Sequence, residues 1–130
     1  MTFYHEQILK IKADIYPKEY LCEQVIQSKL FIKKEFSKNI SLHDIATEAF
    51  LSKFHFIRLF KRQYGRIPCQ YLKETRIARA KSLLQAGMTV KAVCISVGFD
   101  SITSFTGLFK RMTGFSPVAY QNNKKAILKN

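Results

Sequence analysis

The sequence predicts an all-α protein in which two helix-turn-helix subdomains are joined by a long connecting helix. The first observation is an internal repeat, because Ser52–Gly65 reads SKFHFIRLFKRQYG and much of it returns at Ser101–Gly114 as SITSFTGLFKRMTG. The second is that apolar residues recur at helical spacing in and before each copy. The third is the stretch between the copies, which has no internal proline or glycine. A repeat of this length indicates one supersecondary unit built twice.

The first helix of the repeated unit begins after Ser41. Asp44 lies three residues on, which makes a close relative of the capping box. An apolar stripe at helical spacing follows, and it consists of Leu42, Ile45, Ala46 and Ala49. A small residue, Ala46 in one copy and Cys94 in the other, is expected where two helix backbones approach each other closely.

The second helix of the unit is expected over about residues 52–64, and its copy over about 101–113. Ser52 is the predicted cap, and Gly65 can supply the left-handed residue that ends the helix. Its apolar face consists of Phe56, Leu59 and Phe60. The second copy has one more residue just before this helix, Asp100. Two short helices with a basic second helix predict a helix-turn-helix, although two ordinary helical hairpins remain the alternative.

The other elements follow from the same periodicity. Residues 3–16 fit both a helical stripe and strand alternation, and we favour a helix. Pro17 suits the first turn of a helix that runs to about Ser37. Its buried face is predicted to comprise Leu21, Val25, Ser28, Ile32 and Phe36.

Pro68 begins the connecting helix, and Gly87 ends it. Its predicted apolar face consists of Leu72, Ile77, Ala80, Leu83 and Leu84. About 18 helical residues span roughly 27 Å, somewhat less than the ~34 Å between successive major-groove faces of DNA. The resulting organisation is an N-terminal segment (1–16), a first subdomain (17–66), the connecting helix (67–87), and a second subdomain with the C-terminal tail (88–130).

The composition points to a polyanionic partner. Twenty-two Lys and Arg residues against nine Asp and Glu give a net charge of +13. No apolar run is long enough for a membrane span, and the N-terminus lacks a signal-peptide layout. Cys22, Cys69 and Cys94 are far apart and show no zinc-ligand spacing, so we expect reduced, mostly buried cysteines in a cytoplasmic protein.

With these residues laid out, the chain resembles the DNA-binding domain of the AraC/XylS family of bacterial transcription regulators. The resemblance covers about Tyr20 to Gln121 and is carried by IATEAFLSKFHFIRLFKRQYG, by PCQYLKETRIARAKSLL and by VGFDSITSFTGLFKRMTGFSP. It implies two helix-turn-helix subdomains that bind bent DNA through two consecutive major-groove segments, in the nucleoid of a bacterial cell. Most relatives carry a separate effector or dimerisation domain. Only about 16 residues precede the matching part, so we expect a small stand-alone member.

Outward positions of the two second helices are the candidate DNA contacts. Arg58 is the foremost candidate for reading a base, because its guanidinium can take guanine O6 and N7 together, and Phe54 can press on thymine methyl groups. Both match positions that relatives use for base contact, although Arg58 could instead hold phosphate and Phe54 could lie in the core. The candidate base contacts are Lys53, Phe54, Ile57, Arg58, Ile102, Thr103 and Thr106, and the candidate phosphate contacts are Lys61, Arg62, Lys73, Lys91, Lys110 and Arg111.

The second copy departs from the family pattern, since Gly107 aligns with Arg58. Base discrimination there should be weak, because no long donor stands at this position. A glycine within a helix costs about 1 kcal/mol relative to alanine, which suggests close packing or a close approach to DNA. Arg76 matches a family position that we interpret as structural, bridging the subdomains. Lys73 and Lys91 are generic phosphate candidates, and solvated surface is the favoured interpretation of each.

No catalytic constellation, cofactor motif or metal spacing is visible, so we expect neither an enzyme nor a cofactor. The one enzymatic alternative is a DNA-repair methyl acceptor with an AraC-like domain, which would need clustered cysteines. The other alternative is an architectural or weakly specific DNA-binding module that recruits a partner. We expect a monomer on double-stranded DNA, with RNA polymerase as a further candidate partner. Control by protein amount is expected, or by a partner on the stripe Tyr4, Ile8, Ile11 and Ile15, which could instead complete the core.

Overall fold

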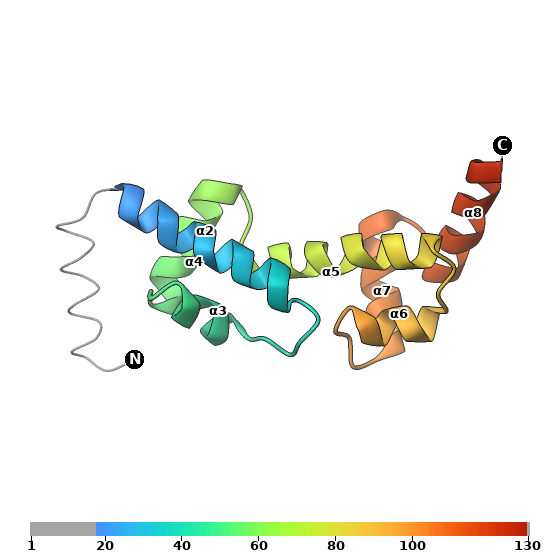
Figure 1. The fold of residues 1–130 in the computed structure, drawn as a ribbon, viewed down its shortest axis with the longest axis horizontal. Coiled ribbons are helices and arrows are strands. Elements are labelled where there is room, and N and C mark those ends of the chain that lie inside the picture. Colours follow the sequence, from blue (N-terminus) through green and yellow to red (C-terminus); the bar gives the residue numbers. More distant parts are fainter. Residues whose placement is uncertain (1–17, 130) are drawn as a thin grey trace. The chain divides into compact units, whose positions relative to one another are not determined.

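The computed structural model describes residues 18–129, and the side-chain environments of residues 21–123. The described residues form helices and no strands, which confirms the all-α fold class (Figure 1). The prediction for residues 3–16 and the start at Pro17 lie outside them. The helices are α2 (Lys18–Glu35), α3 (Leu42–Glu48), α4 (Lys53–Tyr64), α5 (Pro68–Gln85), α6 (Val90–Ser96), α7 (Ile102–Thr113) and α8 (Pro117–Lys129).

The chain divides into two compact units, and α5 belongs to both. The first unit contains α2, α3, α4 and the start of α5 up to Leu72. The second contains the rest of α5 from Lys73, together with α6, α7 and α8. It also contains the short segment Phe36–Asn39 that follows α2.

In the first unit, the predicted face of α2 packs against α3 and α4. Val25, Ser28 and Ile32 are buried, as the helical spacing predicts, and the Ser28 hydroxyl donates to the Val25 carbonyl. The rings of Phe56 and Phe60 meet edge to face with centroids 5.6 Å apart. The buried apolar residues contributed by α3, α4, the turn between them and α5 are Ile45, Ala46, Ala49, Leu51, Phe56, Phe60 and Leu72.

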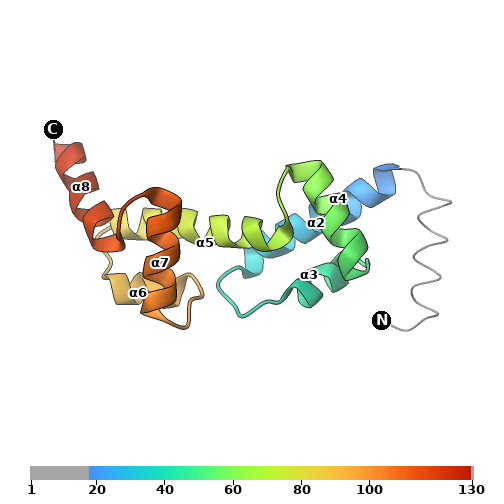
Figure 2. The same ribbon diagram turned by 180° about the vertical axis from the view of Figure 1, so that it is seen from behind.

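The second unit repeats this construction (Figure 2). Phe105 and Phe109 are fully buried, with ring centroids 5.7 Å apart, and Phe109 meets Tyr120 of α8 at 5.3 Å. Phe60 of the first unit meets Tyr71 of α5 in the same way, at 5.7 Å. The buried core of the second unit consists of Ile77, Ala80, Leu84, Val93, Cys94, Val97, Phe105, Phe109 and Tyr120.

The caps predicted for the first unit are all present. The Ser41 hydroxyl accepts from the Asp44 N–H at 3.1 Å, while the Asp44 carboxylate accepts from the Ser41 N–H at 2.9 Å, so the capping box is complete. Ser52 accepts from the His55 N–H at 3.3 Å, and Gly65 ends α4 with a φ of 74°. Thr89, Ser101 and Gly114 serve the same purposes in the second unit. Local chemistry therefore fixes the bounds of both helix pairs.

The turns between the paired helices carry different residues at one equivalent position, although the residue there takes the left-handed conformation in both units. Phe50 occupies it in the first unit with a φ of 55° and is 58% exposed. Gly98 occupies it in the second with a φ of 94°, and an added Cβ there would lie 2.9 Å from the Ser37 carbonyl oxygen. Gly98 therefore serves both the turn and a close backbone approach.

Arg76 binds the segment that follows α2 through two hydrogen bonds within the second unit. Its Nε donates to the Phe36 carbonyl at 2.8 Å, and its Nη2 donates to the Lys38 carbonyl at 3.0 Å. The guanidinium also lies 5.6 Å from the centre of the Phe99 ring. Partial burial lowers the pKa of Arg76, and the nearby Asp100 carboxylate opposes this shift. These contacts give Arg76 a structural role.

The prediction of mostly buried cysteines was wrong. Cys94 is buried, but Cys22 and Cys69 are exposed, because they do not lie on the faces that α2 and α5 bury through Val25 and Leu72. Burial raises the pKa of the Cys94 thiol, and the Asp100 carboxylate raises it further.

Candidate nucleic-acid interface

The interface begins with the way α4 divides its side chains between two faces. Phe56 and Phe60 are fully buried, whereas Phe54 is 80% exposed, which argues against a core role for Phe54. Lys53, Arg58 and Lys61 are exposed and Ile57 is half-buried. Since α4 is amphipathic, burying its phenylalanines brings the predicted contact residues together on the outer face.

The outer face of α4 is strongly cationic around His55, which is half-buried. Burial lowers the pKa of His55, and the positive charges of Arg58 and Arg62 lower it further. A neutral imidazole therefore lies beside two guanidinium groups at neutral pH. This concentration of positive charge attracts an anion, because α4 contains no acidic residue that would neutralise it.

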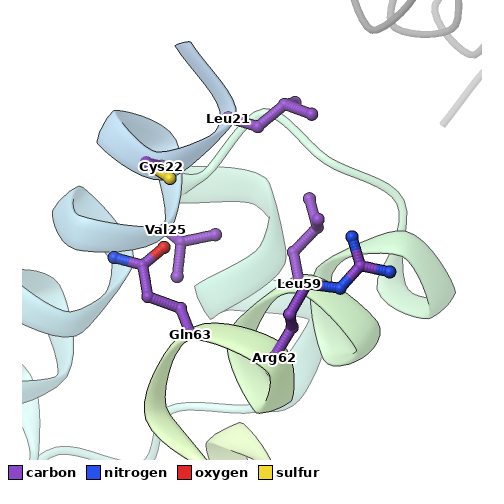
Figure 3. Close-up of a pocket in the computed structure, with 6 residues that line it drawn as sticks. All are labelled: Leu21, Cys22, Val25, Leu59, Arg62 and Gln63. Atoms are coloured by element: carbon purple, nitrogen blue, oxygen red, sulfur yellow. The ribbon is translucent and has the colours of Figure 1, made fainter. Parts of the chain in front are cut away.

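Arg62 differs from the other α4 candidates because it lies at a pocket between α2 and α4. The pocket has a volume of about 200 Å³ and is lined by Leu21, Cys22, Val25, Leu59, Arg62 and Gln63 (Figure 3). Its volume is below the ~300–1,000 Å³ typical of small-molecule sites. Arg62 thus borders this pocket, and its positive charge also acts on His55 together with that of Arg58.

The outer face of α7 is less charged than that of α4. Ile102 is 47% exposed, Thr103 is exposed and Thr106 is half-buried. Lys110 and Arg111 are exposed in the last turn. The structure also leaves Ser104 exposed, whereas its α4 counterpart His55 is half-buried.

Gly107 lies in the middle of α7 and is not tightly packed by the chain itself. Apart from the two neighbouring residues and the backbone of α7 itself, the only described atom within 4 Å of an added Cβ is the Arg111 Nη1, at 3.5 Å, which is an ordinary contact. Its φ is not positive, unlike those of the glycines in the turns. Of the two explanations from sequence, close packing within the chain is therefore wrong.

The remaining candidates lie on other elements. Lys73 is exposed on α5, and Lys91 is exposed on α6. No described contact gathers these two lysines with the outer face of α4 or α7. They remain predicted phosphate contacts with no structural support beyond their exposure.

The described residues contain no cluster of three or more His, Cys, Asp or Glu side chains that could hold a metal ion. Within the same part of the chain, every helix is too short or too polar to cross a membrane.

Comparison with known proteins gives the same assignment as the geometry. Residues 45–123 match the family model described as a helix-turn-helix domain. The probable transcriptional regulator LumQ of Photobacterium leiognathi is 36% identical over 92 residues, which cover 70% of this chain and 37% of LumQ. The bifunctional transcriptional activator/DNA repair enzyme AdaA of Bacillus subtilis (strain 168) is 29% identical over 96 residues, or 73% of this chain and 46% of AdaA. The chain therefore spans less than half the length of these two relatives.

A solved structure extends the comparison to DNA. The DNA-binding domain of AdpA, a global transcriptional factor crystallised in complex with a target DNA, matches with a TM-score of 0.76 and 27% identity. The match covers 78% of this chain and 93% of that domain. Given the two capped helix pairs, their exposed basic faces and the family match, this chain belongs to the AraC-type helix-turn-helix family of DNA-binding transcription regulators.

Proposed function

We propose that this chain is a sequence-preferring regulator that reads two adjacent major-groove segments of duplex DNA, one with α4 and one with α7. The observation that supports it most is the duplication of a complete recognition unit. Both α4 and α7 are 12-residue helices with a serine N-cap, a left-handed glycine at the end and a basic last turn. A weakly specific architectural module would need two basic surfaces, but not two helices presented in the same way.

Base reading is assigned to the first two turns of the outer faces. On α4 the residues are Lys53, Phe54, Ile57 and Arg58, where Arg58 takes a guanine and Phe54 contacts thymine methyl groups. On α7 they are Ile102, Thr103 and Thr106, which offer methyl and hydroxyl contacts. Discrimination in the α7 segment is therefore expected to depend less on charged donors than in the α4 segment.

Phosphate binding is assigned to basic residues that flank these faces. Lys61 and Lys110 occupy equivalent exposed positions in the last turns of α4 and α7, and Arg62, Arg111, Lys73 and Lys91 are the further candidates. If about six phosphates are contacted, the logarithm of the affinity should fall with the logarithm of the salt concentration with a slope near −5. The net charge of +13 favours such binding.

The connecting helix sets the scale of the site. α5 has 18 residues, a length of about 27 Å, against ~34 Å between successive major-groove faces. We expect a monomer to cover about two turns of bent DNA, and bending costs on the order of 1–6 kcal/mol. RNA polymerase is the proposed protein partner, and the cytoplasm of a bacterial cell is the expected place of action. No enzymatic step and no cofactor is assigned to the chain.

Selection of bound duplexes from a random pool, followed by footprinting, tests this function. We expect an enriched motif with two parts, and protection of about two helical turns. Uniform recovery of all sequences would instead support the architectural module. Protection of less than one turn would contradict the use of both helices.

A further inference from the structure

In the two units, equivalent arginines follow different residues by one helical turn, because Arg62 follows Arg58 whereas Arg111 follows Gly107. Arg62 of α4 and Arg111 of α7 occupy the same position in the repeat. Arg62 is one of the residues that line the pocket between α2 and α4 (Figure 3), and its positive charge acts on His55 together with that of Arg58. Arg111 has its Nη1 3.5 Å from the place where a Cβ of Gly107 would stand. The guanidinium of Arg111 therefore lies over the middle of the outer face of α7.

This placement follows from ordinary helix geometry once residue 107 has no side chain. A helical side chain leans toward the N-terminus and covers the preceding turn, so Arg111 is directed toward residue 107. A long side chain at that position would fill the same space. Gly107 leaves this space open. A glycine there costs helix propensity relative to alanine, and neither a positive φ nor close packing among the described residues accounts for its presence.

The place that Arg111 covers corresponds to the one from which α4 projects Arg58, since Gly107 and Arg58 are equivalent in the repeat. Arg58 is exposed at the position proposed to read a guanine. In α7 a guanidinium is again present there, but it comes from one turn later in the helix. Its planar pair of donors fits guanine O6 and N7, as that of Arg58 does.

We propose that Arg111 is the base-reading arginine of α7, that it takes a guanine in the second half of the site, and that Gly107 is the residue that admits it. This assignment rests on the proposed function and replaces the phosphate role expected for Arg111 from sequence. It also changes the expectation for α7, which becomes a discriminating helix with one strong base preference.

The test compares Arg111→Lys with Arg79→Lys, at an exposed arginine of α5 outside the proposed contacts, on a duplex selected by the wild-type protein and on single-base-pair variants of its second half. Lysine keeps the positive charge but loses the paired donors. We expect Arg111→Lys to lose on the order of tenfold discrimination at one guanine, while Arg79→Lys keeps it. Unchanged discrimination in Arg111→Lys would show a phosphate contact and overturn the proposal.

A second pair of variants addresses Gly107 itself. Gly107→Leu fills the space over which Arg111 lies and should lose discrimination at the same base pair. Gly107→Ala makes only an ordinary contact with Arg111 and should keep it. Equal behaviour of the two variants would overturn the role of Gly107, provided that circular dichroism shows both to be folded. A wild-type protein without any base preference would refute the proposed function itself, whereas a wild-type preference that survives Arg111→Lys refutes only this inference.

Discussion

Replacing Gly98 by alanine should destabilise the protein more than replacing any other turn glycine by alanine. An added Cβ would lie 2.9 Å from the Ser37 carbonyl oxygen and 3.0 Å from the Phe36 carbonyl oxygen. Both are backbone atoms, so no side-chain rotation relieves the overlap. The segment that would have to move is also held by Arg76, which donates to the Phe36 carbonyl at 2.8 Å.

The expected cost has two parts. Holding an L-residue in the left-handed region costs roughly 1–2 kcal/mol, and the φ of Gly98 is 94°. Forcing a methyl group into a filled space costs typically about 1–3 kcal/mol more. The free energy of unfolding should therefore fall by about 2–5 kcal/mol. At about 4–8 °C per kcal/mol for a domain of this size, the melting temperature of the second unit should drop by at least about 8 °C.

Gly114→Ala is the matched control, because Gly114 lies in the same unit, has a φ of 85° and has nothing within 4 Å of an added Cβ. It should show the conformational part alone, about 1–2 kcal/mol. Urea unfolding followed by far-ultraviolet circular dichroism measures both variants. If Gly98→Ala costs no more than Gly114→Ala, the close approach to the segment after α2 is refuted.

The remaining predictions concern three side chains. Arg76→Met should lower the free energy of unfolding by about 2–4 kcal/mol, because two charge-assisted hydrogen bonds are lost from a half-exposed group, and an unchanged urea midpoint would contradict the structural role of Arg76. The lowered pKa of His55 means that the unfolded chain binds more protons, so stability should be full above the ordinary pKa of 6.5 and be lost as the pH falls from there through the folded-state pKa. His55→Gln should flatten this part of the pH profile, and an identical profile in the variant would refute the assignment. Ser52→Ala should cost about 1 kcal/mol through loss of the α4 cap, measured by thermal unfolding, and no loss would show that the cap is dispensable.

Much of the fold could be predicted from sequence because its determinants are local. The caps at Ser41 and Ser52 are visible as residue types at fixed spacing, and so is the left-handed glycine at residue 65. Because the second unit repeats the sequence pattern of the first, the same structure could be predicted there, and Ser101 indeed caps α7. Apolar periodicity identified the buried faces, since it depends only on the helical repeat of the backbone.

Other features depend on contacts between residues far apart in sequence. The hydrogen bonds of Arg76 reach the segment Phe36–Lys38, and only the resemblance to a family suggested a structural role. The left-handed conformation of Phe50 carries no sequence signal, because an aromatic residue is unfavourable there.

The candidate site shows the same division. The residues on the outer face of α4 could be predicted from the buried phenylalanines alone, because a helix that buries one face exposes the opposite face. The position of the Arg111 guanidinium beside Gly107 could not, because it depends on the conformation that this long side chain adopts.

The central claim is that outward residues of the recognition helices read base sequence, and Arg58→Ala tests it most directly. The measurement is the affinity for a selected duplex and for a scrambled one, each over a range of salt concentrations. We expect a loss of about 1–3 kcal/mol on the selected duplex, little change on the scrambled one, and relaxed preference at one or two base pairs. Lys110→Ala, in contrast, should weaken binding to both duplexes equally. If Arg58→Ala lowers both affinities by the same factor, Arg58 is a phosphate anchor and α4 does not read sequence through it.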